Sequence, residues 1–440
     1  MTKPSLGNFP PNGLLANYRN LEPCERNVFL AARACLTFRT MSISTAARLA
    51  RSWLLLPVYL VTDVLLPWLK FSAASQQAYG HSRVRQLMEV VRGTLTSGPC
   101  GRKGYYRSCL ARHKGGKELA SYIHDQFHET QVAFCRYAVT RLLGDQPQLG
   151  NKYSLALLCR QAGVPSVITL AAVSQDGSVE WMAEDAKAQM QAAQSLFVKP
   201  SHGTQGQHAQ RWDNASGSFT SNNGTLAKSA DAVISEVASL ARQTGRQMLV
   251  QLAISNSKEI QSYGSRAVST VRLVTLLSHN GDIMPVQAGM RFGGTADGIV
   301  DNYSAGGIYF VADHHTGELL TGLATTAAQK PEFKTTPPLS NKVVTGTIIP
   351  RWKEVVDLAK TAHRAMTRHT ICGWDIAVTE DGPVIVECND IPGCPVPGQR
   401  PNGFYGTDYS KLLHREILYY LNQLEPENSR FRFKTGIEQS

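Results

Sequence analysis

Apolar residues follow two different periods along the chain, and the period changes near residue 150. From Lys117 to Leu143 they recur every three to four residues, which is typical of a helix that buries one face. Gly144 follows at the position where a helix commonly ends. From Asn151 onward, short apolar runs alternate with helical segments, which predicts strands and helices in turn. The pattern therefore indicates a mainly helical region over residues 1–145 and a mixed region after it.

The mixed region is predicted to contain closely spaced elements. Helices are expected over residues 152–162, 231–241, 352–366 and 409–424, and strands over 166–173, 195–199, 248–252, 268–278, 283–292, 308–312, 372–379 and 383–389. Asn280-Gly281 is a strong hairpin signal between two of these strands. Residues 324–347, rich in Thr, Pro and Lys, and the Pro/Gly segment 393–403 are predicted to be loops.

The last predicted hairpin carries two acids on neighbouring strands. Side chains alternate along a strand, so Glu387 and Asn389 point the same way. A three-residue turn at 380–382 would place Asp375 opposite Glu387. Two carboxylates and an amide oxygen would then share one face, and oxygen ligands of this kind suit Mg²⁺. The alternative is a solvated strand face without a ligand.

A lysine and a glycine-rich loop follow the strand predicted at 195–199. Lys199 ends that strand, and the segment from Ser201 to Gly206 has glycines at 203 and 206. Glycines let backbone N–H groups approach an anion, and a lysine adds a point charge. The loop lacks the spacing of a P-loop, since no G-x-x-x-x-G-K-[ST] motif occurs in the chain. An ordinary surface loop is the competing interpretation.

Two arginines lie within or at the end of apolar strands. Arg272 interrupts the run STVRLVTLL, and Arg291 ends the next predicted strand. An unpaired charge at such positions is costly, so each arginine needs an anionic partner. Beside the carboxylate pair they would form a clamp for phosphate or for a carboxylate substrate, or else a buried structural ion pair. Asp301-Asn302 follows in a loop that is expected to face a ligand.

In this order, the motifs resemble the ATP-grasp superfamily, and closely its sugar-transfer-associated branch related to α-L-glutamate ligases. The resemblance extends from about Asn151 to Gly403, and its most specific pieces are STVRLVTL, RFGG with VDNYSAGG, and GWDIAVTEDGPVIVECN. It implies an α+β fold in which two lobes grip ATP, after a mainly helical N-terminal region. The expected boundaries are 1–145 for that region, 146–250 and 251–425 for the lobes, and 426–440 for a tail.

The resemblance also implies a role for each matching residue. Lys152 and Lys199 would hold the ATP phosphates, and Met248–Leu252 would be the adenine hinge, with Gln251 nearby. The phosphate-covering loop and its neighbourhood would comprise Ser201, His202, Gly203, Thr204 and Gly206, with Asp301 and Asn302 also at the nucleotide. Arg272 and Arg291 would stabilise the transferred phosphoryl group, and Mg²⁺ would be bound by Asp375, Glu387 and Asn389.

One departure from the family pattern concerns the ribose. Many ATP-grasp chains place an acid just after the hinge, whereas here the hinge continues as QLAISNSKE and Glu259 lies further along. The resemblance still implies an ATP- and Mg²⁺-dependent ligase that activates a carboxylate or enol oxygen as a phosphate and joins it to an amine. The alternatives are a phosphotransferase that stops at the phosphorylated product and a nucleotide-binding partner of a membrane assembly.

Composition agrees with a globular enzyme that binds anions. The 440 residues include 42% hydrophobic and 18% charged residues, with a formal net charge of +11. No reader motif or aromatic-interleaved basic run supports nucleic acid as a partner, so small-molecule acids and amines are expected instead. The nine cysteines are irregularly spaced and contain no C-x-x-C pair, which favours reduced thiols in a cytoplasmic protein.

The apolar segment Trp53–Leu69, WLLLPVYLVTDVLLPWL, leaves three interpretations open. It is shorter than the roughly 20 apolar residues of a spanning helix, and Pro57 and Pro67 interrupt it. A packed core helix, a helix on a membrane surface or on a partner, and a true span all remain consistent with the pattern. Membrane association is therefore an open alternative to a purely cytoplasmic location, and the sequence predicts no oligomeric state.

Overall fold

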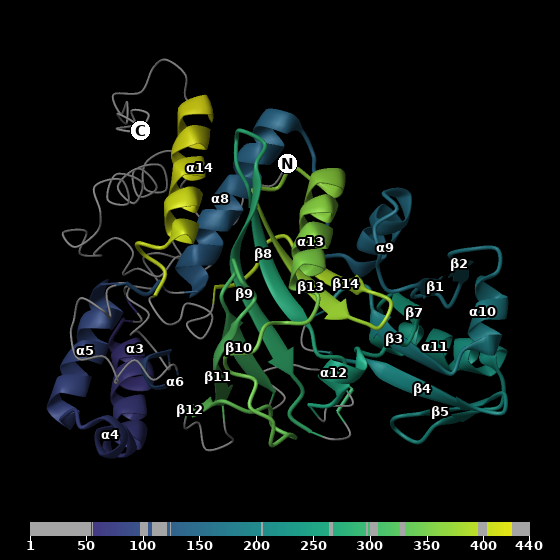
Figure 1. Cartoon of the computed structure of the whole chain (residues 1–440), viewed down its shortest axis with the longest axis horizontal. Helices are drawn as coiled ribbons and strands as arrows, with labels where there is room; N and C mark the ends of the chain where they lie inside the picture. The colour runs from purple at the N-terminus through teal and green to yellow at the C-terminus, as the bar shows by residue number, and fades with distance from the viewer. Residues whose placement is uncertain are drawn as a thin grey trace.

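The structure is a computed structural model that describes residues 54, 56–96, 104–107, 121–123, 125–203, 206–263, 267–295, 298–299, 307–325, 331–394 and 403–424. Two seven-stranded sheets form most of the molecule. The first sheet and a group of N-terminal helices lie at opposite ends of the long axis, with the second sheet between them (Figure 1). The predicted α+β architecture, with a helical region before two α+β lobes, is confirmed.

The first sheet has the strand order β2-β1-β7-β3-β4-β5-β6, and its strands pair antiparallel. Helix α11 (Ala230–Thr244) packs on it because Val233, Val237 and Ala241 recur on one buried face. The helix begins at Ser229, whose hydroxyl accepts a hydrogen bond from the N–H of Ala232. The remaining elements are β1 (Thr169–Val173), β2 (Val179–Trp181), β3 (Ser195–Pro200), β4 (Gln210–Ala215), β5 (Ser218–Ser221), β6 (Leu226–Ala227), β7 (Met248–Leu252) and α10 (Ala186–Ala192).

The second sheet has the order β12-β11-β10-β9-β8-β13-β14 and is also antiparallel. Its strands are β8 (Val271–Leu277), β9 (Ile283–Phe292), β10 (Ile308–Ala312), β11 (Leu319–Thr325), β12 (Pro331–Lys334), β13 (Ile371–Val378) and β14 (Pro383–Asn389). The short helix α12 (Lys258–Gln261) precedes it in the chain. Every residue of β13 is buried, as expected for a strand covered by helices on both faces.

Helices cover the second sheet from two sides (Figure 1). One apolar core contains side chains of α9 (Lys152–Gln161) and α13 (Trp352–Met366), together with Leu273, Met290 and Trp374 of the sheet. A separate core contains side chains of α8 (Asp125–Leu143) and α14 (Asp408–Leu424), together with Val274 and Ile371. The sheet therefore holds its site-bearing strands between two apolar layers.

Several sequence-based expectations for this region were wrong in detail. The predicted loop 324–347 contains the edge strand β12 and the end of β11. The helix predicted over 117–143 begins at Asp125 within the described residues, and the strand predicted from residue 166 begins at Thr169. The short strands β2, β4, β5 and β6 and the helices α10 and α12 were missed, because each is too short to show a period.

The N-terminal helices form a small packed unit that comprises α3 (Leu56–Tyr59), a π-helical turn η3 (Leu60–Leu65), α4 (Leu66–Tyr79), α5 (Arg83–Thr96) and α6 (Gly104–Arg107). Its core contains Val64, Val90, Tyr105, Tyr106 and Tyr122. Among the described residues, no helix is both long and apolar enough to cross a membrane. The segment after Trp53, which itself lies outside the described residues, packs one side into this core and leaves the other side exposed.

Candidate active site

A cavity of about 660 Å³ lies between the two sheets, with walls from β3 and β7 on one side and from β8, β9, β13 and β14 on the other. Most of the site residues predicted from the sequence line this cavity: Lys152, Lys199, His202, Gly203, Gly206, Gln251, Arg272, Arg291, Asp375, Glu387 and Asn389. Ser201 lies beside it in the glycine loop. Thr204, Asp301 and Asn302 lie outside the described residues.

The two predicted acids lie side by side on neighbouring strands, as the sequence predicted. Asp375 on β13 is the direct ladder partner of Glu387 on β14. The predicted three-residue turn is wrong, however, because Val378 pairs with Pro383 and Ile376 with Ile385. The register then shifts by one residue, which leaves Val386 as the extra residue of a β-bulge. The bulge, rather than the turn, brings the two carboxylates opposite each other.

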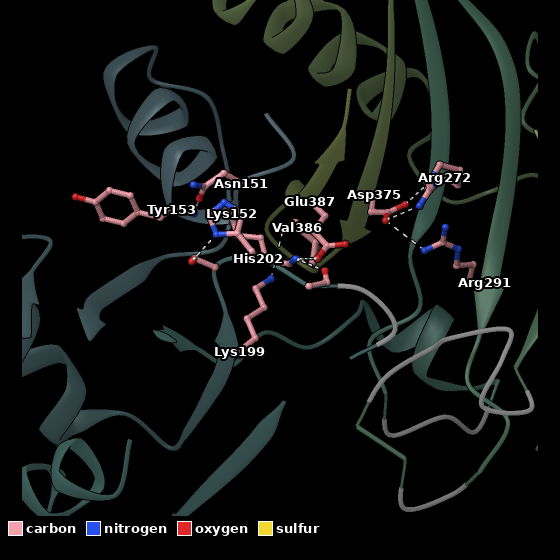
Figure 2. A network of polar contacts seen from close by, with 12 residues as sticks. Asn151, Lys152, Tyr153, Lys199, His202, Arg272, Arg291, Asp375, Val386 and Glu387 are labelled. Carbon is pink, nitrogen blue, oxygen red and sulfur yellow. Dashed lines mark hydrogen bonds and ion pairs between the residues drawn. The ribbon is translucent and has the colours of Figure 1, made fainter. Parts of the chain in front are cut away.

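Asp375 is held by two arginines (Figure 2). Arg272 donates from Nε and Nη2 to the two carboxylate oxygens at 2.5 and 2.9 Å, and Arg291 donates from Nη1 at 3.2 Å. Burial alone would raise the pKa of Asp375, but the charges of Arg272 and Arg291 lower it below the ordinary value. The carboxylate therefore stays ionised although it is only 3% exposed.

Lys152 connects the two sheets. It stands at the start of α9, which Asn151 caps by accepting hydrogen bonds from the N–H groups of Tyr153 and Ser154. The Lys152 ammonium pairs with Glu387 at 2.8 Å and donates to the carbonyl of Gly203 at 3.1 Å (Figure 2). The same lysine thus contacts Glu387 and the glycine loop, and a phosphate bound between them would lie close to its positive charge.

Lys199 is a buried cation at the end of β3. Its ammonium lies 3.4 Å from the carbonyl oxygen of Val386, the bulged residue. Burial lowers the pKa of Lys199 to about 8, although Glu387 and Asp375 act in the opposite direction. A buried lysine with a weak neutral acceptor is a position that an anionic ligand would stabilise.

Two glycines of the glycine loop have positive φ angles. Gly203 has a φ of 144° and Gly206 a φ of 68°, which side-chain-bearing residues rarely adopt. Ser201 is buried, and its hydroxyl lies 3.1 Å from Nδ1 of His202. Backbone hydrogen bonds anchor Ser201, whose N–H donates to the carbonyl of Gln247 and whose carbonyl accepts from the N–H of Lys152. The glycines let the loop backbone border the cavity.

The segment predicted to be the adenine hinge forms the strand β7, and its adenine contact stays a prediction. Gln251 is buried and donates from Nε2 to the hydroxyl of Thr169 at 2.8 Å, so its side chain fixes β7 against β1. The cavity wall continues through Leu252 and Ile254 and is completed by Phe197 of β3. An apolar wall beside backbone groups suits a flat heterocycle. Glu259 is not among the described residues that line the cavity, which agrees with the departure noted for the ribose.

Sequence reasoning missed several residues that line the cavity, among them Arg211, and it missed Tyr309, which lies near Arg272 and Arg291. Arg211 lines the cavity from β4, and the polar context of its short strand gave no signal. Tyr309 of β10 pairs with Arg291 across the sheet, and Gly289 leaves the space that its ring occupies. Burial raises the pKa of Tyr309 to about 12, although the nearby charges of Arg272 and Arg291 act in the opposite direction. An apolar strand that carries a single tyrosine beside a glycine was the available signal.

The donor set fits Mg²⁺ in chemistry. Asp375, Glu387 and Asn389 offer hard oxygens on the same cavity, and one or two carboxylates with phosphate oxygens are typical for this ion. Both carboxylates also have cationic partners. Within the described residues no three His, Cys, Asp or Glu side chains gather as a metal site.

Three similar solved structures match the chain at low identity. D-alanyl-alanine synthetase A from Vibrio cholerae has a TM-score of 0.36 and 13% identity, with 62% of this chain and 65% of that chain covered. L-amino acid ligase from Bacillus licheniformis has a TM-score of 0.33 and 11% identity, with 61% and 48% covered. Carboxyaminoimidazole ribonucleotide synthase from Aspergillus clavatus, complexed with ATP, has a TM-score of 0.32 and 12% identity, with 59% and 50% covered.

These alignments span between about half and two thirds of each solved chain. No curated protein matches the chain. The family model described as sugar-transfer associated ATP-grasp matches residues 144–403, more than half of the chain. The fold is accordingly that of an ATP-grasp protein. Within that class, the chain belongs to the sugar-transfer-associated ATP-grasp family, as its motifs predicted.

Proposed function

We propose that this protein is an ATP- and Mg²⁺-dependent ligase that activates a carboxylate or enol oxygen as a phosphate and joins it to an amine or amino acid. The observation that carries the proposal is the convergence of Lys152, Lys199, Arg272 and Arg291 on one cavity between two sheets. Four cations around two acids leave net positive charge for a polyphosphate. The product would belong to small-molecule, glycan or peptide biosynthesis.

Each cation is placed for a different part of the reaction. Lys152 and Lys199, beside the glycine loop, would hold the nucleotide phosphates against the first sheet. The apolar wall after β7 would take the adenine. Mg²⁺, held by Asp375, Glu387 and Asn389, would neutralise phosphate charge during transfer. The two arginines lie beyond these acids, where the acceptor would meet the transferred phosphoryl group.

The arginine pair supports acyl-phosphate chemistry because it is fixed before substrate arrives. Asp375 engages Nε and Nη2 of Arg272 and Nη1 of Arg291, which leaves further N–H donors on each guanidinium. Donors held rigidly in a buried site stabilise developing negative charge without reorganising. Tyr309 adds a hydroxyl beside the same two charges. These groups would orient the acceptor oxygen and shield its phosphate from water.

A product assay tests the proposal. ATP, Mg²⁺ and panels of carboxylic acids with amines are supplied, and ADP, phosphate and coupled product are measured by mass spectrometry. A ligase releases ADP and phosphate at full rate only when acid and amine are both present. ADP with a stable phosphorylated acceptor would identify a phosphotransferase instead. A wild-type protein whose thermal stability does not respond to ATP and Mg²⁺ would contradict nucleotide binding itself.

A further inference from the structure

The outer side of the N-terminal helices carries a continuous apolar stripe. Leu54, Val58, Val61, Leu65 and Leu69 follow one another at steps of three or four residues, which places them on one face. Their exposed fractions range from 40% for Leu65 to 80% for Leu54. This set is called the outer stripe below.

The opposite side of the same helices is already packed. Val64 and Pro67 are buried, and Phe71 packs against the small core of this unit. Trp68 donates to the carbonyl of Arg83 at 2.8 Å, while the Arg83 guanidinium lies 4.9 Å from the Trp68 ring. The segment from Leu54 to Leu69 therefore has apolar side chains on two sides, and the small core covers only one of them. Soluble monomers rarely leave so long an aliphatic surface in water, so the outer stripe is expected to have an occupant.

The net charge of the chain comes from the part of the sequence that contains the outer stripe. Residues 1–145 contain 19 Lys and Arg against 8 Asp and Glu, which gives the whole formal charge of +11, whereas residues 146–440 contain 26 of each. Lys70, directly after the outer stripe, is exposed. An exposed aliphatic face in a positively charged part of the sequence suits a lipid bilayer, which is apolar inside and anionic at its surface.

We propose that the outer stripe docks this protein onto the surface of a bilayer that contains anionic lipids. The docked helices would lie in the interface rather than span it, in agreement with their length and with Pro57 and Pro67 within the segment. A protein partner fits less well, because the exposed side chains of the stripe are Leu and Val, and protein interfaces rely on aromatic anchors. Since the cavity lies between the two sheets, away from this helical unit, docking leaves it open (Figure 1).

Vesicle co-sedimentation of the full chain tests this docking. Wild type is mixed with vesicles of phosphatidylcholine alone or of phosphatidylcholine with phosphatidylglycerol. Wild type is expected to sediment with the anionic vesicles and to be released by high salt, because the electrostatic part is screened. The Leu65→Gln/Leu69→Gln variant should bind about tenfold or more weakly, since two half-exposed leucines no longer enter the apolar layer.

A matched control separates docking from general surface hydrophobicity. Leu226 and Val343 are each 60% exposed and lie outside the helical unit, so the Leu226→Gln/Val343→Gln variant should bind vesicles as wild type does. Hydrogen–deuterium exchange should show that vesicles protect residues 56–79 in wild type. An unchanged ATP-dependent thermal shift in the stripe variant would show that it is folded and that nucleotide binding is separate from docking.

Three results would overturn the proposal. The first is a wild type that stays in the supernatant with both vesicle types. The second is equal binding by the stripe variant and wild type. The third is concentration-dependent self-association that the stripe variant loses while vesicles have no effect, because a second copy of the chain would then be the occupant.

Discussion

Arg272 and Asp375 occupy directly opposed positions on β8 and β13, and two hydrogen bonds join the guanidinium to both oxygens of the carboxylate. The sequence left open whether Arg272 was a substrate clamp or a structural ion pair. The geometry shows an ion pair that is largely buried and also lines the cavity, so the clamp role stays a prediction. Loss of Asp375 would leave two arginine charges without a carboxylate partner, and loss of Arg272 would leave Asp375 with Arg291 alone.

Substitution of Arg272 should therefore affect stability and turnover together. We expect Arg272→Met to lower the free energy of unfolding by about 3–5 kcal/mol, because it removes one partner of a buried pair. Arg272→Lys should retain part of the stability but not the two-point contact, so turnover should stay about a hundredfold or more below wild type. Urea denaturation and ADP release measure the two effects. Wild-type turnover in Arg272→Lys would remove the proposed catalytic role.

The low pKa of Lys199 predicts a pH dependence. Below about pH 8 the lysine is charged in the folded and unfolded states, so the penalty of its burial is fully present. Between about pH 8 and 10.4 the unfolded chain holds more protons at this position, so stability should rise with pH relative to Lys199→Met. ATP affinity should fall over the same range as the cation is lost. Parallel pH profiles of thermal stability and ATP binding in both proteins measure this, and identical profiles would contradict it.

Glu387→Gln should abolish turnover and leave the fold intact. The side chain is 32% exposed and its ion pair with Lys152 is near the surface, so stability should change by no more than about 1 kcal/mol. The Mg²⁺-dependent part of the ATP thermal shift should disappear because a metal-binding oxygen is replaced. Glu354→Gln, which breaks the surface pair with Arg351, is the matched control. Normal turnover in Glu387→Gln would exclude the metal assignment.

Gly289→Ala should disturb the acceptor side of the site through packing. A Cβ at this position would collide with the ring of Tyr309 and the backbone oxygen of Phe310. We expect a loss of about 1–3 kcal/mol in unfolding free energy from overpacking. Adding Tyr309→Ala should recover part of that loss, and a double-mutant cycle measures the coupling. Strictly additive effects would mean that the ring does not press on residue 289.

Thr275→Val should destabilise the sheet behind the site without touching the cavity. The Thr275 hydroxyl accepts a hydrogen bond from the Trp374 indole at 2.8 Å and lies 2.7 Å from Nδ1 of His363. Valine would leave both buried groups unpaired, which should cost about 2–4 kcal/mol. ATP affinity should be retained at low temperature. A variant as stable as wild type would show that water replaces the hydroxyl.

The pattern of apolar and polar residues was sufficient to predict the bounds of several strands and one helix around the site. The strands β7, β9 and β10 and the helix α13 have the predicted bounds, because each has a clear period and a glycine, turn or cap at its ends. The pairing of Asp375 with Glu387 was predicted for the wrong reason, since a β-bulge depends on how β14 is held by its surroundings. Residues 165–167, which are distant in sequence, form that contact through hydrogen bonds to Ile385.

Contacts between residues far apart in the chain could not be predicted from the positions of residues along the sequence. The sequence identified Glu387 by strand alternation and Lys152 by resemblance, but their ion pair joins α9 to β14 across residues far apart in the chain. Tyr309 and Arg211 were missed because their importance comes from what lies beside them in space. The roles assigned to Thr204, Asp301 and Asn302 stay predictions, since these residues lie outside the described part of the chain.

Under the proposed function, Glu387 and the nucleotide phosphates would compete for the ammonium group of Lys152. A triphosphate that enters the cavity meets a lysine already neutralised by Glu387 and hydrogen-bonded to Gly203. Binding is then an exchange of one anionic partner for another, and the measured affinity is the difference between the two arrangements. The Lys152 ammonium group contacts Glu387 of the second sheet and Gly203 of the glycine loop. It therefore links the two sides of the cavity.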